Sequence, residues 1–442
     1  MMSKIIIFTL IFGFVIPVGT YLAIKYPKVR LVAFILMLAF TCNMQMIHLY
    51  PLPDWRGSAR GFAFSMVDIN ASIVFLSIWF DSRCSKRFFP PGYWTYFIYY
   101  FFIVISGINA LYLQPWGFEV LKMFWMYIFF VATFNFLMNY KNLWTIIYTI
   151  CGIVFYMFLV GFYQKYISGG YYQIPSTMPH QNSLTLYVEI FGSIILGVML
   201  NEKTKHWQSI VLIIGFFSCL LLSIFTYSRG GLFCFMLATS VVGMGSIALN
   251  GITSQKVSFI AMGVVGGIIL LAIAMPRIIQ RFETAPEASK NTRIFLAKAA
   301  VRMAQDYRLG VGANNFSAHS GATGIYAAEM YENKKITEDT SPFGGIVETI
   351  YLLVAAESGW VALGALLLWF AYYFILAIRC VWALRYHSCF GISLGLFAGL
   401  LANFSQSTIE WSLKQYGNFY QLMFVFALIS AIWTCRKSLR KR

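Results

Sequence analysis

Charged residues are scarce in this chain, and their scarcity excludes an ordinary soluble protein. Only 11% of the 442 residues are Asp, Glu, Lys or Arg, whereas 59% are hydrophobic and 18% are aromatic. Apolar runs recur from residue 5 to residue 435, each close to the ~20 residues that cross the hydrocarbon core of a membrane. The alternating segments of about 10 residues that a membrane β-barrel needs are lacking. The sequence therefore predicts an all-α integral membrane protein.

Patterns for metal binding and disulfide bonding are lacking too. The eight cysteines lie in or beside apolar runs and form no Cys-x-x-Cys pair, which favours neither a disulfide framework nor a zinc site. The expected outer loops contain no Asp-x-Asp motif and no cluster of His with carboxylates, so we expect no metal and no cofactor. The net charge of +17 is spread over short loops, which argues against nucleic acid as a partner.

The apolar runs predict 12 or 13 transmembrane helices. Thirteen runs are visible, and twelve spans with one miscount fit equally well. The basic C-terminal tail is expected in the cytoplasm by the positive-inside rule, and counting back from it orients every loop. The expected spans are 5–24, 31–50, 61–80, 93–113, 118–138, 143–163, 183–200, 208–226, 230–249, 257–275, 350–378, 389–409 and 417–435.

The segment 276–345 departs from this pattern, because 16 of its 70 residues are charged. We expect it to be one large periplasmic loop that contains an amphipathic helix at 291–307, lying on the membrane face. The apolar positions of that helix are Ile294, Phe295, Ala297, Val301 and Ala304. The predicted organisation is a transmembrane bundle (1–275), a periplasmic loop subdomain (276–345), and C-terminal transmembrane helices with a basic cytoplasmic tail (346–442).

Among the outward stretches, Thr226-Tyr227-Ser228-Arg229-Gly230-Gly231 places an arginine between two long apolar runs. Arg229 is either an interfacial side chain that reaches toward water or a phosphate ligand. Guanidinium binds phosphate oxygens bidentately, and the flanking glycines allow close backbone approach. His180, at the start of a predicted span, either lines a glycan site or makes a helix-entry hydrogen bond.

A second outward stretch begins at Arg293 and continues to Leu309-Gly310-Val311-Gly312-Ala313-Asn314-Asn315-Phe316. Gly-rich turns of this kind end many helices. Gly310 and Gly312 are therefore open to two interpretations, an ordinary cap and loop or part of a binding site, and Arg293 is either solvated or a ligand.

The third stretch, Val347-Glu348-Thr349-Ile350-Tyr351-Leu352-Leu353, opens a long hydrophobic helix on the outer side. Glu348 either complements the helix dipole or acts as a general base, because partial desolvation raises the pKa of a carboxyl group. Glu357 lies nine residues further on, roughly on the opposite face of the helix. We expect Glu357 to have a structural partner rather than to share the role of Glu348.

In this order and at these separations, the three stretches resemble the O-antigen ligase and Wzy-type O-antigen polymerase superfamily, the Wzy C-terminal domain family, over about residues 180–375. The resemblance implies that Arg229 and Arg293 bind the pyrophosphate of an undecaprenyl-linked glycan. The ligases of the family carry His-Asn-x-Tyr-Leu, with the His proposed as the base, where this chain has Glu348-Thr349-Ile350-Tyr351-Leu352. The carboxylate can accept the same proton, and the difference favours a polymerase over a ligase.

The resemblance implies a metal-independent glycosyltransferase of the bacterial cytoplasmic membrane, a Wzy-type polysaccharide polymerase with its active site facing the periplasm. The alternatives are an O-antigen ligase that joins the glycan to lipid A-core and, from another class, a lipid-linked glycan transporter or flippase. The expected partners are an undecaprenyl pyrophosphate-linked oligosaccharide donor, a glycan acceptor, membrane lipid and other polysaccharide assembly proteins. The expected catalytic residues are Glu348, Arg229 and Arg293, and the expected substrate-binding residues are Arg229, Arg293, His180, Gly310, Gly312 and Tyr351.

Overall fold

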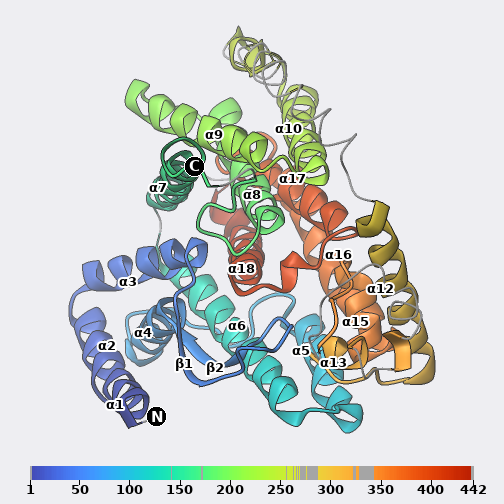
Figure 1. Ribbon diagram of the computed structural model, residues 1–442. Coiled ribbons are helices and arrows are strands. Elements are labelled where there is room, and N and C mark those ends of the chain that lie inside the picture. The colour runs from blue at the N-terminus through green and yellow to red at the C-terminus, as the bar shows by residue number, and fades with distance from the viewer. Residues whose placement is uncertain are drawn as a thin grey trace.

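The structure is a computed structural model, and it describes residues 2–140, 142–170, 173–254, 256–261, 263–264, 266, 268, 275, 287–321, 325–327 and 343–439. The chain is mostly helical (Figure 1). The elements are α1 (Met2–Leu10), η1 (Ile11–Val15), α2 (Ile16–Lys25), α3 (Pro27–Ala39), η2 (Phe40–Cys42), β1 (Met46–Pro51), β2 (Gly61–Ser65), α4 (Met66–Phe80), α5 (Tyr93–Ile105), η3 (Ser106–Asn109), α6 (Leu113–Asn139), α7 (Leu143–Phe162), η4 (Tyr163–Ile167), α8 (Gln181–Asn201), α9 (His206–Phe225), α10 (Arg229–Asn250), α12 (Glu287–Asp306), α13 (Phe316–His319), η5 (Ile325–Ala327), α15 (Ile350–Ser358), α16 (Trp360–Leu384), α17 (Phe390–Gln406), η6 (Ser412–Lys414) and α18 (Tyr416–Leu439).

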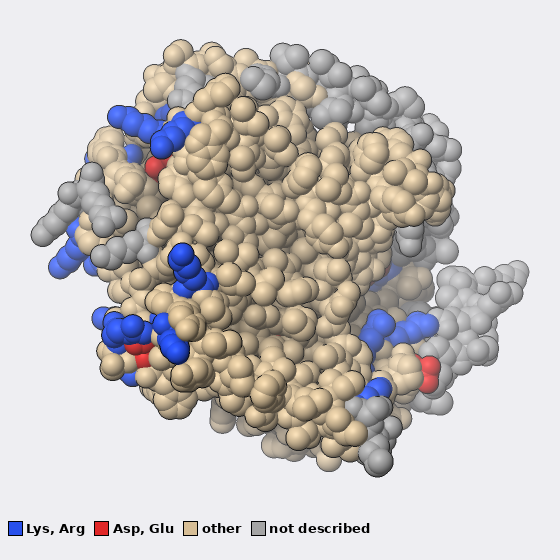
Figure 2. Space-filling view, turned by 90° about the vertical axis from the view of Figure 1, so that its left-hand side faces the viewer, with Lys and Arg blue, Asp and Glu red and all other residues tan. Residues whose placement is uncertain are grey.

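Within the described residues, eight helices are long and apolar enough to cross a membrane. Figure 2 shows that Lys, Arg, Asp and Glu gather toward opposite margins of one face, with a broad uncharged band between them. Both features are typical of a multi-pass membrane protein. The candidate spans are Lys4–Lys25, Leu113–Asn139, Leu143–Ile167, Gln181–Asn201, His206–Phe225, Arg229–Asn250, Trp360–Leu384 and Tyr416–Leu439.

The expected spans 31–50 and 61–80 are wrong in part, because each includes a β-strand. Helix α3 ends at Ala39, and β1 and β2 pair as an antiparallel hairpin in which Met46 lies opposite Ser65. The chain is therefore not all-α. A short apolar run suits a buried helix and a strand equally well, so hydrophobicity alone did not separate the two.

Three other expected spans are also shorter or interrupted. The span 93–113 is a helix of 13 residues, α5, followed by the 3-10 turn η3. The span 350–378 is broken at Gly359, which has φ 90° and packs so closely on the Arg308 carbonyl oxygen that a Cβ there would clash. The span 389–409 is a helix of 17 residues, α17. Nine of the 19 residues of the expected span 257–275 lie outside the described residues.

Helices α8 and α17 pack along each other near the centre of the molecule (Figure 1). Gly391, Gly395 and Gly399 recur every four residues on one face of α17, and their backbone lies directly against α8. A Cβ on Gly395 would be only 2.5 Å from the Cα of Ile194. Small residues at this spacing let two membrane helices approach closely. This contact fixes the N-terminal end of α8 next to the C-terminal end of α17.

Helix α12 corresponds to the amphipathic helix expected at 291–307, and its buried face matches the expected one only in part, with Ala304 buried as expected. Leu296, Ala299, Ala300 and Met303 are buried in a small core with Val311, Phe316, Val347, Leu353 and Ala356. Ile294, expected on the apolar face, is 44% exposed. The apolar side of α12 thus packs on α15 and on the 311–316 segment.

Candidate functional site

A cavity of about 720 Å³ opens where the chain enters α8 and α10 and leaves α17. Gln415, which also lines it, directly precedes α18. Because α18 runs from there to Leu439, the basic residues Arg436 and Lys437 in its last turn lie at the opposite end of the bundle. The cavity therefore occupies the end of the molecule remote from the C-terminal tail.

The charged lining of this cavity is unbalanced in favour of positive charge. Four arginines and two glutamates line it, together with one histidine. An excess of guanidinium groups in a partly enclosed space attracts multiply charged anions, and arginine is suited to phosphate oxygens. The charged and histidine side chains are Arg56, Arg60, Arg229, Arg293, Glu348, Glu410 and His180, and the other lining residues include Asn182, Gln406, Trp411 and Gln415.

Arg293 and Glu348 form an ion pair across the cavity wall, with Nε and Oε2 2.6 Å apart. The buried apolar face of α12 orients Arg293, and Glu348 follows Val347 of the same small core. Both side chains keep contact with solvent, at 49% and 35% exposed. Burial raises the pKa of the Glu348 carboxyl, and the Arg293 guanidinium opposes that rise.

Arg229 is the first residue of α10 and sits in a turn that other elements hold tightly. Ser228 caps the helix, and its Oγ accepts a hydrogen bond from the Gly231 amide. A Cβ on Gly231 would lie 2.5 Å from the Cβ of Thr185 in α8, so only glycine fits. The Ser-Arg-Gly-Gly sequence therefore serves to place Arg229 at the junction of α10 and α8.

His180 caps α8 as the helix-entry interpretation requires, and it also lines the cavity. Its Nδ1 accepts a hydrogen bond from the Asn182 amide at 3.2 Å. Burial lowers the pKa of His180, and the positive charge of Arg293 lowers it further. A neutral imidazole that accepts at Nδ1 carries its proton on Nε2.

Glu410 is a site residue that sequence reasoning missed. It lies between α17 and η6, is 8% exposed, and accepts a hydrogen bond from the Asn182 side-chain amide. Burial raises its pKa to about 8; the carboxylate of Glu348 adds to this rise, and Arg293 opposes it. The available signal was an isolated acidic residue in a short loop between the last two expected spans.

Two further residues missed from the sequence are Arg56 and Arg60, in the connection between β1 and β2. Asn314 holds this connection in place. Its Oδ1 accepts from the Ser58 amide at 2.9 Å, and its Nδ2 donates to the Ala59 carbonyl at 2.8 Å. The Asn-Asn-Phe part of the second stretch thus positions two cavity arginines.

The other three expected site residues lie elsewhere and are not among the described residues that line the cavity. Gly310 has φ 73° and packs on the backbone of Glu357, and the Gly312 amide donates to the Glu357 carbonyl. Together they close the C-terminal end of α15. The Tyr351 hydroxyl donates to the Phe404 carbonyl at 2.9 Å, which joins α15 to α17. Their visible contacts are structural.

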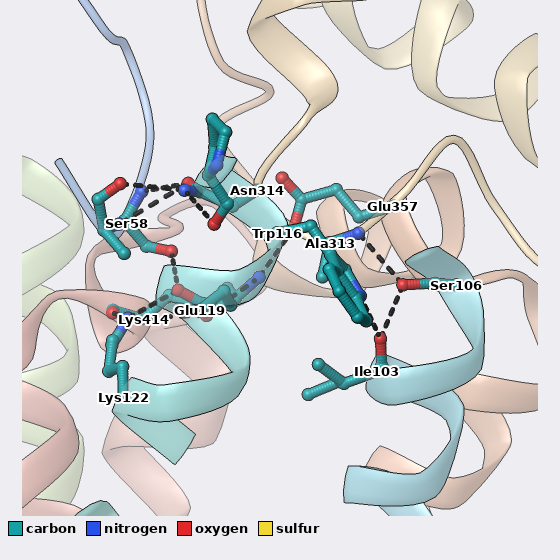
Figure 3. Close-up of polar contacts among 12 residues, drawn as sticks. Ser58, Ile103, Ser106, Trp116, Glu119, Lys122, Ala313, Asn314, Glu357 and Lys414 are labelled. Atoms are coloured by element: carbon teal, nitrogen blue, oxygen red, sulfur yellow. Dashed lines mark hydrogen bonds and ion pairs between the residues drawn. The ribbon is translucent and has the colours of Figure 1, made fainter. Parts of the chain in front are cut away.

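Beneath the cavity lies a buried cluster of charged side chains, Glu119 and Lys122 of α6, Glu357 of α15 and Lys414 of η6 (Figure 3). Lys414 Nζ is 2.6 Å from Glu357 Oε2 and 3.6 Å from Glu119 Oε1. Lys122 Nζ donates to the Lys414 carbonyl at 2.7 Å, and Ser58 Oγ donates to Glu119 at 2.6 Å. The expectation that Glu357 has a structural partner is confirmed. The cluster ties two segments that carry cavity residues, η6 and the β1–β2 connection, to α6 and α15.

Within the described part of the chain, no group of three His, Cys, Asp or Glu side chains is arranged to hold a metal ion. No protein-family model matches the chain, and no curated protein matches it either. The cavity and its charges are therefore the observations that any functional assignment must explain.

Proposed function

We propose that this protein is a membrane glycosyltransferase that moves an undecaprenyl pyrophosphate-linked glycan onto an acceptor sugar at the periplasmic face. The observation that supports this proposal is the cavity at one end of the helix bundle, which is lined by four arginines and two glutamates. Such a site complements a pyrophosphate, whose charge must be neutralised while its isoprenoid chain stays in the membrane. The resemblance of the three outward stretches to the ligase and polymerase superfamily points the same way.

The chemistry proposed is direct displacement at the anomeric carbon. Arg229 and Arg293 stabilise the charge that develops on the departing pyrophosphate, and no metal is needed for that step. Arg56 and Arg60, on the β1–β2 connection, add positive charge to the same cavity. His180, neutral and donating from Nε2, is placed to hydrogen-bond a sugar hydroxyl or a phosphate oxygen.

Orientation in the bacterial cytoplasmic membrane follows from charge. The C-terminal end of α18 carries Arg436 and Lys437, and the full sequence continues with three more basic residues. The positive-inside rule assigns that end to the cytoplasm. The cavity, at the opposite end of α18, then faces the periplasm, where lipid-linked glycans of this kind would meet their acceptors.

Between the two reactions of this class, we propose a polysaccharide polymerase. Glu348 stands where the ligases of the family have His, and that departure from the ligase motif is the reason for the choice. A polymerase uses the same lipid-linked repeat unit as donor and acceptor, whereas a ligase needs lipid A-core.

Reconstitution tests the proposal and separates the two reactions. Purified protein in liposomes receives undecaprenyl pyrophosphate-linked repeat units extracted from the producing bacterium, with or without lipid A-core. A ladder of longer lipid-linked chains supports a polymerase, and transfer only to lipid A-core supports a ligase. If neither product forms while the protein remains folded, the glycosyltransferase proposal is wrong.

One observation favours transport of the lipid-linked glycan as a second candidate. Glu189, in the middle of α8, is 0% exposed, and neither carboxylate oxygen has a hydrogen-bond partner among the described residues. Ionisable groups inside membrane helices often mark ion or proton pathways. Proton-coupled movement of labelled lipid-linked glycan across liposomes, abolished by Glu189→Gln, would favour the transporter, whereas glycan transfer unaffected by Glu189→Gln favours the enzyme.

A further inference from the structure

Two carboxyl groups share the cavity, and their surroundings differ. Glu348 is ion-paired with Arg293 at 2.6 Å and is 35% exposed. Glu410 is 8% exposed and receives a hydrogen bond from the neutral amide of Asn182. An ion pair with a guanidinium favours the charged carboxylate and lowers its tendency to accept a proton. Of the two, Glu410 is the group whose contacts leave it better suited to proton transfer.

The short loop that carries Glu410 is fixed at both ends. On the α17 side, Gln406 Nε2 donates to Thr185 Oγ1 at 2.7 Å, and the Ile409 amide donates to the Gln406 carbonyl at 3.0 Å. On the η6 side, Lys414 is locked into the buried charge cluster through Glu357. A carboxyl held this way keeps one position in the cavity, as a group that must meet a reacting hydroxyl requires.

Several charged groups from different elements face this cavity and set the protonation of Glu410. The positive charge of the Arg293 guanidinium opposes proton uptake by Glu410, and the negative charge of Glu348 together with burial favours it. These groups are Glu348 before α15, Arg293 of α12, Arg229 of α10, His180 before α8, and Arg56 and Arg60 between β1 and β2.

We propose that Glu410, rather than Glu348, accepts the proton of the attacking hydroxyl, an inference that rests on the glycosyltransferase function proposed above. The acceptor oxygen forms a bond to the anomeric carbon of the donor. The bond from that carbon to the pyrophosphate oxygen breaks, and its electron pair leaves with undecaprenyl pyrophosphate. The hydroxyl proton passes to the Glu410 carboxylate and then to water. Glu348 acts as a positioning residue that aligns Arg293.

If Glu410 is the base, the rate of glycan transfer should increase with pH. The base works only when it is ionised, and burial beside Glu348 raises the pKa of Glu410 to about 8. The rate of transfer should therefore rise with pH and level off above about 8, because the ionised fraction of Glu410 grows across that range. Glu348→Gln removes a neighbouring negative charge, so the pH profile should shift to lower pH while keeping its shape.

The test compares three acid-to-amide variants in liposomes with lipid-linked repeat units from the producing bacterium. Glu410→Gln keeps a carbonyl oxygen for the Asn182 hydrogen bond but cannot accept a proton. We expect a fall of about 10² to 10⁴ in single-turnover rate and a flat pH profile. Glu348→Gln should mainly raise KM for the donor. Asp306→Asn serves as the matched control. The carboxylate of Asp306 accepts a hydrogen bond from the Tyr326 hydroxyl.

A second variant at the same position separates proton acceptance from a structural role of Glu410. Glu410→Asp retains a shorter carboxylate, so partial activity with a preserved pH dependence supports proton acceptance over a purely structural role. A wild-type rate and profile in Glu410→Gln, or a flat profile in Glu348→Gln instead, overturns the assignment. With either of these variant results, the wild-type protein still transfers glycan, so only the role of Glu410 is rejected. If the folded wild-type protein transfers no glycan, the proposed glycosyltransferase function is rejected, and the role of Glu410 with it.

Discussion

The guanidinium of Arg293 lies against the carboxylate of Glu348, with Nε 2.6 Å from Oε2. From the sequence, we expected Arg293 to be a phosphate ligand and Glu348 to be a general base. Their ion pair joins α12 to the segment before α15, and it holds Arg293 at the cavity while part of the guanidinium stays exposed. The pair therefore explains how α12 can contribute to a fixed site.

Replacing Arg293 with Lys tests whether the fork of its guanidinium matters. Lys keeps the charge but cannot reproduce two parallel hydrogen bonds. Loss of one charge-assisted hydrogen bond, about 1.5 to 3 kcal/mol, predicts a fall in kcat/KM of about 10- to 100-fold. Steady-state rates with the lipid-linked donor measure it. Arg308→Lys, an exposed arginine near the end of α12, is the control; an equal effect in both variants would remove Arg293 from the site.

The buried charge cluster predicts a large stability effect at Lys414. Lys414→Met leaves Glu357 buried without its cation, whereas Glu119 keeps its ion pair with Lys122. Removing one partner of a buried pair costs about 3 to 5 kcal/mol. Thermal unfolding of the purified protein in detergent should show a markedly lower Tm. Lys437→Met, at an exposed position near the C-terminal end of α18, should leave the Tm unchanged. An unaltered Tm in Lys414→Met would show that the cluster does not stabilise the fold.

The glycine face of α17 predicts a contrast between two Gly→Ala changes. In Gly395→Ala the new methyl group meets the Ile194 Cα at 2.5 Å, so α8 and α17 must separate. We expect about 1 to 3 kcal/mol of destabilisation and reduced transfer, since these helices hold Asn182 and lead into the Glu410 loop. In Gly243→Ala no atom lies within 4 Å of the added Cβ, and the helix should gain about 0.5 to 1 kcal/mol. Equal Tm shifts in both variants would contradict the packing argument.

Topology is tested by two single cysteines in a background without the native ones. Gln305, near the end of α12, and Ser82, after α4, are both exposed. With the proposed orientation, an impermeant maleimide added to intact spheroplasts should label Gln305→Cys and spare Ser82→Cys until the membrane is opened. Labelling in the reverse order would put the cavity in the cytoplasm, where periplasmic transfer is impossible.

Much of the helical architecture could be read from the sequence, because long uniformly apolar runs leave helices as the only spanning structure. The predicted spans were wrong where strand pairing or a close backbone contact interrupts a helix. The β1 and β2 strands have no distinctive apolar pattern, and the break at Gly359 depends on the carbonyl of Arg308, which lies 51 positions away in the chain. Such contacts are tertiary and leave no periodicity in the sequence.

For the candidate site, the sequence singled out Arg229, Arg293, His180 and Glu348, and the structure brings these four to one cavity. Each stands out locally, as a charge beside apolar runs or at a helix start. Glu410 stands out only as an isolated acidic residue in a short loop, because its burial and its hydrogen bond with Asn182 depend on contacts far away in the chain. Arg56 and Arg60 lie in the connection of a hairpin whose two strands were expected to belong to two spans.

The central claim is that glycan transfer from a pyrophosphate-linked lipid takes place in the arginine-rich cavity. The most direct test measures both products of that reaction in the same samples. Liposomes that contain the purified protein and labelled lipid-linked repeat units are sampled for new glycosidic bonds and for free undecaprenyl pyrophosphate. We predict one undecaprenyl pyrophosphate released per bond formed by the wild type, with both products lost in Arg229→Ala and retained in Arg308→Lys. Equal product formation by Arg229→Ala, or lipid-linked glycan that crosses the bilayer without bond formation, would contradict the account.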